Sequence, residues 1–177
     1  MSDNINIIGI GGAGTNITKY IDYGKPTLLN SSTCNSADGV IEKIDFKNQS
    51  KDVVIITSPA GQFSSQVLPT VCSTLNSKGK RIFLIAVMPF HFESEERKER
   101  AERTMRTVRS MVDSYQIVEN ENFASAMLDR PWDDVIERIN SFVKGILFKH
   151  LLHAGSDVQV ATQDIQSYPV FQHTTSS

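Results

Sequence analysis

The chain of 177 residues lacks the features that mark several large classes of protein. Its only two cysteines, Cys34 and Cys72, lie far apart and outside any metal-ligand spacing, which excludes a disulfide scaffold and is typical of a reducing cytosol. No apolar run reaches the roughly 18 residues of a membrane span, and no basic patch precedes the first apolar run, so we predict neither a membrane helix nor a signal peptide.

The sequence also lacks a large excess of positive or of negative charge. The sequence has 18 Lys and Arg against 20 Asp and Glu, a net charge of −2, which gives no support for a nucleic-acid or membrane partner. With 40% hydrophobic residues the chain can build a core, and at roughly 150 residues per domain its length predicts one domain. We expect a cytoplasmic protein with this domain in residues 1–154 and a polar, partly flexible tail in 155–177.

Short apolar runs alternate with helical patterns along the chain. A short β-branched run over 5–10 that ends in glycine predicts a buried parallel strand, and further short runs predict strands over 27–30, 52–57, 81–87 and 115–118. Apolar residues at helical spacing predict helices that begin near 17 and cover 62–76, 94–112 and 131–153. This alternation predicts an α/β fold, a doubly wound parallel sheet with helices on both faces.

Four glycines, Gly9, Gly11, Gly12 and Gly14, join the first strand to the first helix. Such a loop allows close approach of a phosphate, and the helix start supplies amide donors. The spacing contains GxGxxG, but about 20 residues on stands 30–32, Asn-Ser-Ser, instead of the acid that binds a ribose, which disfavours a dinucleotide enzyme. The absence of Gly-Lys-Ser/Thr excludes a Walker loop. A purely structural glycine turn remains an alternative.

Two segments carry a resemblance to a known family. Residues 7–16, Ile-Ile-Gly-Ile-Gly-Gly-Ala-Gly-Thr-Asn, resemble the first nucleotide loop of FtsZ, the bacterial and archaeal relative of tubulin. Residues 89–93, Pro-Phe-His-Phe-Glu, with Arg97 four residues after Glu93, resemble the family stretch whose glutamate and arginine reach the ribose and phosphates of GTP. Glu93 and Arg97 stand one helical turn apart, so a surface ion pair is the alternative interpretation.

Two further matches follow in the same order as in the family. Residues 118–121, Val-Glu-Asn-Glu, take the place of a segment with an asparagine at the guanosine, which is Asn120 here. Residues 132–136 resemble the start of the long central helix, where an aspartate matching Asp134 reads the guanine edge; helix-start charge is the alternative. The resemblance implies a Rossmann-like GTPase domain with its central helix, without the family's second domain. It assigns nucleotide binding to Gly11, Gly12, Ala13, Gly14, Asn16, Gly61, Glu93, Arg97, Asn120 and Asp134.

The chain departs from the family pattern at two places. The family's glycine-rich phosphate cradle is replaced by residues 58–66, where only Gly61 remains, Phe63 is expected to add bulk, and Ser64 and Ser65 are expected to offer hydroxyls to a phosphate. The acidic loop that positions water in a neighbouring subunit has no match, because the acids after residue 153, at 157 and 164, are isolated. Phosphoryl transfer depends on positioning and charge neutralisation, so we predict no catalytic residues, no metal ligands and no efficient GTPase.

Two functions remain open. The first is a single-domain FtsZ/tubulin-like protein that binds GTP or GDP weakly, with Mg²⁺ accompanying GTP, and hydrolyses little or none. The alternative is a nucleotide-free pseudo-GTPase that acts in assembly or as a structural or FtsZ-interacting protein. The expected partners are the chain itself or a tubulin/FtsZ-like or structural protein.

Overall fold

The structure of the chain is a computed structural model that describes residues 5–19, 21, 26–34, 36–44 and 50–153. The tail predicted for 155–177 and the two acids at 157 and 164 lie outside the described residues.

The described residues contain one parallel sheet of five strands in the order β2-β1-β3-β4-β5. Every neighbouring pair of strands is parallel. The strands are β1 (Asn6–Ile10), β2 (Thr27–Leu29), β3 (Asp52–Thr57), β4 (Arg81–Met88) and β5 (Ser114–Glu119). All five lie where the short runs predict them. The chain leaves β1 toward β2 on one side and returns to β3 on the other, so the direction of winding reverses at β1.

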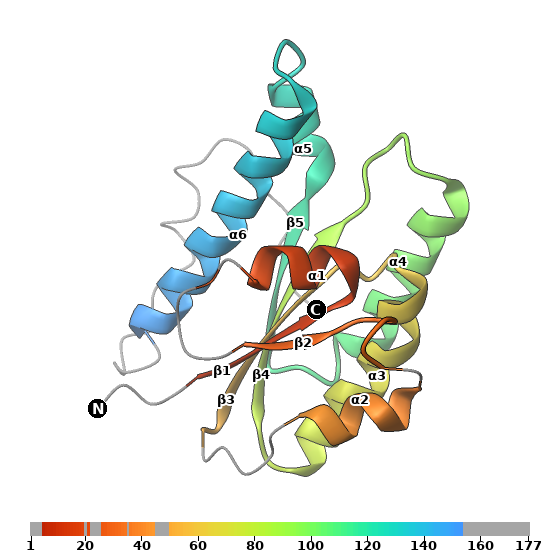
Figure 1. Cartoon of the computed structure of the whole chain (residues 1–177), viewed down its shortest axis with the longest axis vertical. Coiled ribbons are helices and arrows are strands. Elements are labelled where there is room, and N and C mark those ends of the chain that lie inside the picture. Colours follow the sequence, from red (N-terminus) through yellow and green to blue (C-terminus); the bar gives the residue numbers. More distant parts are fainter. Residues whose placement is uncertain (1–4, 20, 22–25, 35, 45–49, 154–177) are drawn as a thin grey trace.

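Helices cover both faces of the sheet (Figure 1). They are α1 (Gly11–Thr18), α2 (Ala37–Lys43), α3 (Gln62–Ser77), α4 (Glu95–Val108), α5 (Asn120–Ala126) and α6 (Trp132–His153). Buried side chains of α2, α3 and α4 share one core cluster, whereas those of α1, α5 and α6 share the other. The doubly wound α/β prediction is confirmed.

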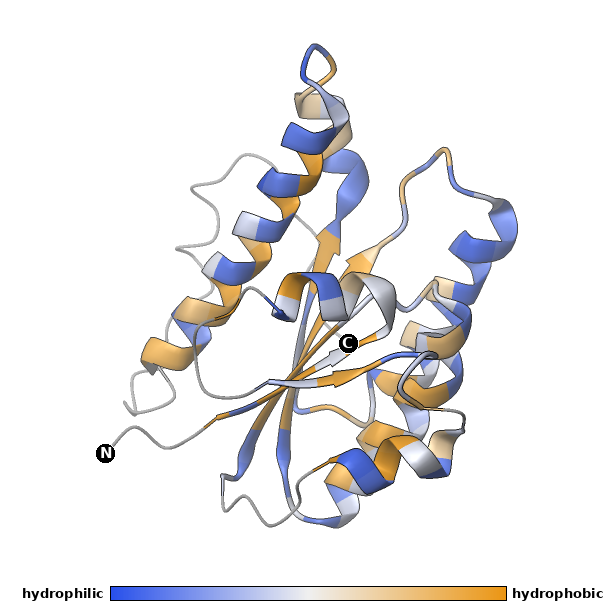
Figure 2. Cartoon of the chain, viewed as in Figure 1, coloured by the Kyte–Doolittle hydropathy of each residue, from blue (hydrophilic) through white to orange (hydrophobic). Residues whose placement is uncertain are grey.

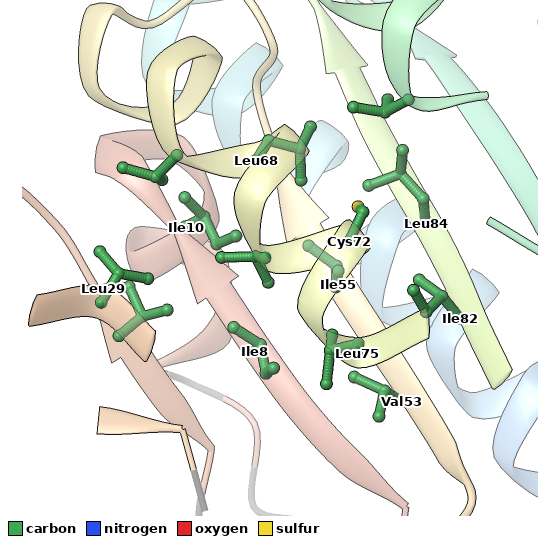
Figure 3. Close-up of a cluster of buried hydrophobic side chains, with 14 of the residues drawn as sticks. Ile8, Ile10, Leu29, Val53, Ile55, Leu68, Cys72, Leu75, Ile82 and Leu84 are labelled. Carbon is green, nitrogen blue, oxygen red and sulfur yellow. The ribbon is translucent and has the colours of Figure 1, made fainter. Parts of the chain in front are cut away.

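The first core cluster lies between the sheet and α3 (Figure 3). Leu68 and Cys72 of α3 face Ile10, Ile55 and Leu84 of the strands, and all five side chains are fully buried. Burial of each large aliphatic side chain contributes about 1.5–3 kcal/mol, so this layer fixes where α3 begins over the sheet.

The second core cluster lies under α6. The apolar positions Val135, Ile139, Val143 and Leu147 are buried at intervals of three to four residues, as the periodicity predicts. In Figure 2 the orange segments of this helix lie toward the sheet, whereas the first turns of α4 are blue.

Two details differ from the sequence prediction. The first helix begins at Gly11 and not near residue 17, because Gly11 makes the turn itself with φ +76°, a conformation that favours glycine. The short helices α2 and α5, seven residues each, are not predicted, since seven residues are too few to show a periodic apolar face.

Candidate functional site at the carboxyl edge of the sheet

The sequence-predicted site residues gather at the carboxyl edge of the sheet, where each strand passes into the next helix. Gly11–Gly14 and Asn16 lie on α1, Gly61 precedes α3, Glu93 lies between β4 and α4, and Arg97 lies in the first turn of α4. Asn120 is the first residue of α5, and Asp134 lies in the first turn of α6. In open parallel sheets the ligand crevice forms at this edge where the winding reverses, which here is between β1 and β3.

A hydrogen bond fastens the two strand ends at this point. The buried Thr57 hydroxyl, at the end of β3, donates to the carbonyl oxygen of Ile10, at the end of β1, over 2.9 Å. The starts of α1 and α3 also lie close to each other, because a Cβ atom on Gly11 would lie 3.3 Å from both Cβ and Oγ of Ser64.

The positive ends of the helix dipoles at these two helix starts have no described side-chain partner to offset them. Within the described residues, neither α1 nor α3 has a side-chain cap or an acidic residue in its first turn. By contrast, α2 and α4 are capped by Ser36 and Ser94 and carry first-turn acids. First-turn amides without intrahelical partners attract anions, so the crevice between β1 and β3 suits an anionic group.

Three of the four glycines have a packing role. A Cβ on Gly9 would lie 2.1 Å from the Thr18 Oγ1, and one on Gly14 would lie 2.2 Å from the Ile56 carbonyl oxygen. Gly11 is held by its positive φ. Gly12 differs, because it is exposed and a Cβ there would have no described neighbour within 4 Å. The open surface of the glycine loop is therefore Gly12 and the half-exposed Ala13.

The loop between β3 and α3 is closed by its own hydrogen bonds. The Ser64 hydroxyl donates to the Ser58 carbonyl over 2.5 Å, and the Ser65 hydroxyl donates to the Gln62 carbonyl over 3.1 Å. These two hydroxyls thus have partners in their own segment, and their expected role toward a phosphate stays a prediction. Phe63 differs from its prediction, since it packs against the first core cluster.

Glu93 and Arg97 form the ion pair that their spacing allows. Oε1 of Glu93 accepts from Nε of Arg97 over 2.8 Å, and Oε2 accepts from the Phe90 amide over 2.6 Å. The Glu93 carboxylate thus holds the β4–α4 turn. The Arg97 side chain stays 41% exposed, which leaves the other guanidinium nitrogens to reach a ligand.

The other end of the edge offers groups that suit a base. Among the described residues, the buried Oδ1 of Asn120 has no hydrogen-bond partner, and a buried acceptor of this kind needs a donor. Trp132, the residue that sequence reasoning missed, is 47% exposed. Its ring centroid lies 4.9 Å from that of Phe90 and 5.5 Å from that of Phe92, so one part of the ring is held while the rest remains available for stacking. The sequence feature that could have drawn attention to this residue is that the chain has no other tryptophan.

Solved structures share this architecture. CetZ from Methanosaeta thermophila superposes with a TM-score of 0.68 at 18% identity, over 93% of this chain and 59% of that one. An FtsZ structure from M. jannaschii, described as an empty dimer, gives the same four values. CetZ1 from Haloferax volcanii, described as a GDP-bound monomer, has a TM-score of 0.67 at 13% identity, over 94% of this chain and 64% of that one.

The chain has an FtsZ/tubulin-like fold. It spans about three fifths of the length of these solved structures. No protein-family model matches the chain, and neither does any curated protein. The FtsZ/tubulin-like fold agrees with the resemblance drawn from the sequence, and it places both the glycine loop and the start of the long helix at one edge.

The described part of the chain has no group of three or more His, Cys, Asp or Glu side chains that could hold a metal ion. None of its described helices is long and apolar enough to cross a membrane. Burial raises the pKa of the Cys72 thiol to about 12, so this thiol stays protonated and is a poor nucleophile.

Proposed function

We propose that the chain binds a guanine nucleotide, GDP or GTP, at the carboxyl edge of the sheet and hydrolyses GTP little or not at all. The observation that carries the proposal is the meeting of the uncapped, acid-free starts of α1 and α3 at the point where the winding reverses. That arrangement favours phosphate groups. The GDP-bound state of one matched structure, CetZ1, supports a nucleotide as the anion.

The choice of guanine rests on the groups at the far end of the edge. Guanine presents N–H donors that suit the unpartnered Oδ1 of Asn120 and the carboxylate of Asp134, and the exposed part of Trp132 can stack on a base. Adenine offers a different donor pattern and would leave these acceptors unpaired. We therefore expect binding of GDP and GTP without binding of ATP.

Weak hydrolysis follows from the loop between β3 and α3. The hydroxyls of Ser64 and Ser65 are neutral and donate to carbonyl oxygens of the same segment, and residues 58–66 include no Lys or Arg that could neutralise charge on a third phosphate. Phosphoryl transfer needs such neutralisation and positioning. Mg²⁺ would enter with GTP, held mainly by the phosphates. We expect GTP to bind no more tightly than GDP.

Titration calorimetry with GDP, GTP and ATP tests the proposal, and a pair of matched variants locates the site. Gly12→Asp places a carboxylate at the open start of α1, where there is room for it. Gly145→Asp makes the same change at an exposed glycine of α6 that is equally free of neighbours. Like-charge repulsion should weaken GDP binding roughly tenfold or more in Gly12→Asp and leave it unchanged in Gly145→Asp. Silent titrations of the wild type with all three nucleotides would refute the proposal.

A second candidate function, self-assembly, is favoured by the separation of charge along the strand direction. Acidic residues open several helices at the carboxyl edge: Asp38, Glu95, Glu96, Glu121, Asp133 and Asp134. Basic residues gather toward the opposite edge: Lys43, Lys51, Lys78, Arg81, Arg106 and Arg109. The separation is incomplete. At the carboxyl edge Lys98 pairs with Glu95 and Arg100 pairs with Glu96, and Arg97 and Arg130 also lie there. At the opposite edge Asp52 pairs with Arg81, and Glu42 and Asp113 also lie there.

Exposed apolar side chains accompany both edges. Phe92, Leu128 and Trp132 are exposed at the carboxyl edge, and Phe148 and Leu152 are exposed toward the other end of α6. Two copies placed end to end would therefore match in charge and in apolar surface. One matched FtsZ structure is described as a dimer.

Sedimentation velocity over a range of protein and salt concentrations tests this candidate. Association should weaken with salt, and it should weaken in Arg106→Glu but not in Arg138→Glu, an exposed arginine in the second turn of α6. A single monomer peak at every concentration would exclude self-assembly and leave nucleotide binding untouched.

A further inference from the structure

Arg100, in the second turn of α4, joins this helix to the loop between β3 and α3. One guanidinium nitrogen, Nη1, donates to the carbonyl oxygen of Ala60 over 2.9 Å. The other, Nη2, donates to Oε1 of Glu96, in the same helix, over 2.7 Å. The Arg100 side chain is only 15% exposed, whereas Glu96 is 76% exposed. The Arg100 side chain thus extends inward from α4 and donates a hydrogen bond to the backbone of a loop 40 residues earlier.

The loop that Arg100 grips is the one that sets the start of α3. Ala60 is fully buried, and it directly precedes Gly61, the N-cap residue of α3. Ser64, one turn into α3, donates back to Ser58 and lies against Gly11. A continuous set of contacts therefore leads from Arg100 through the β3–α3 loop to the first residue of α1.

No local feature of the loop replaces this grip. The Gly61 amide donates to the Ser58 carbonyl at 3.4 Å, a long hydrogen bond, and the other loop bonds join residues of the same segment. Only the Arg100 bond ties the Ala60 carbonyl, within the described residues, to another helix. A guanidinium with two fixed donors is well suited to such a bridge, because little freedom is lost for each bond formed.

We infer that Arg100 is a positioning residue for phosphate binding. It holds the β3–α3 loop so that the first-turn amides of α3 face the crevice. This inference rests on the proposed nucleotide site and adds the residue that orders its second helix start. Because Arg100 acts through the loop, it contributes to the binding free energy of the ligand's phosphates and not to that of its base.

Ligands with different numbers of phosphates test this division of roles. Binding of guanosine, GMP and GDP is measured by calorimetry for the wild type, Arg100→Gln, Arg100→Lys and Arg103→Gln. Arg103 is the matched control, since it is exposed and lies one turn further along the same helix. Arg100→Gln should weaken GDP binding about tenfold and GMP binding less, and it should leave guanosine unchanged. Arg100→Lys should fall between Arg100→Gln and the wild type, and Arg103→Gln should behave as the wild type.

Amide hydrogen exchange without ligand gives a second, independent measurement. Arg100→Gln should speed exchange in a peptide covering 58–66, and Arg103→Gln should not. Equal weakening of guanosine and GDP by Arg100→Gln would show a general loss of structure and overturn the inference, as would unchanged exchange. A wild type that binds no GDP overturns the proposed function and the ligand part of this inference, whereas GDP binding unaffected by Arg100→Gln overturns the inference alone.

Discussion

Two alanine substitutions two residues apart in α1 should change stability in opposite directions. At Gly14 a Cβ atom would lie 2.2 Å from the Ile56 carbonyl oxygen and 3.3 Å from the carbonyl carbon of Gly9. Relief of the shorter contact requires α1 to move away from β3 by about 1 Å, since carbon and oxygen atoms pack at more than 3 Å. Overpacking of this kind costs about 1–3 kcal/mol, and backbone on both sides puts Gly14→Ala at the upper end.

Helix propensity works against this cost but does not cancel it. Alanine is favoured over glycine in a helix by about 1 kcal/mol, so the net loss for Gly14→Ala is on the order of 2 kcal/mol. For a domain of this size, that loss lowers the Tm by about 4–8 °C. At Gly12 the new Cβ has open space, so only the propensity acts, and Gly12→Ala should gain about 0.5–1 kcal/mol.

Urea unfolding followed by circular dichroism measures both changes in the free energy of unfolding, and a thermal scan provides the Tm. The m-value of each variant should equal that of the wild type, because the amount of surface exposed on unfolding is the same. The reasoning fails if Gly14→Ala is as stable as the wild type, or if Gly12→Ala is the more damaging of the two. Either result would mean that α1 does not pack on β3 as closely as described.

Three further predictions concern how far single side chains are buried or exposed. Leu147→Ala removes a fully buried side chain of α6 and should cost about 2–5 kcal/mol in urea unfolding, whereas Leu152→Ala, at a residue 75% exposed, should cost less than about 0.5 kcal/mol. Because burial raises the pKa of the Cys72 thiol to about 12, this thiol should resist a thiol reagent at pH 8 until denaturant is added; rapid labelling of the native protein at Cys72, read by peptide mass spectrometry, would contradict its burial. Since Trp132 is the only tryptophan, GDP should change the intrinsic fluorescence of the wild type, and unchanged emission at saturating GDP would exclude stacking on this ring.

The sequence contains most of the information on the sheet and the long helices. The strands β1, β3 and β4 are mostly buried runs rich in apolar residues, and α3 and α6 repeat apolar residues over enough turns to show a period. The short helix α2 has no such repeat. Its start is marked only by Ser36, whose hydroxyl accepts from the Gly39 amide, and a lone serine is too common to predict a helix.

The candidate site was predictable in place but not in detail. The glycine loop and the three other motif matches, at 89–97, 118–121 and 132–136, locate the residues at one edge. They do so because parallel strands bring their carboxyl ends together. The roles of single groups depend on contacts between distant segments, such as Arg100 with Ala60, which no local pattern reveals. Phe63 illustrates the same limit, since only the position of α3 over the core decides that its ring turns inward.

The strand order also has a consequence for how the chain folds. The strand β1 pairs along its whole length with β3, so Asn6 stands beside Val53, 47 residues later. Its other neighbour, β2, is only three residues long. A growing chain that has reached residue 30 therefore holds a mainly apolar strand with one edge unpaired, and contacts between distant segments form slowly. The N-terminal third cannot complete its sheet until β3 has been synthesised, so its aggregation-prone period ends only when Thr57 can close onto Ile10.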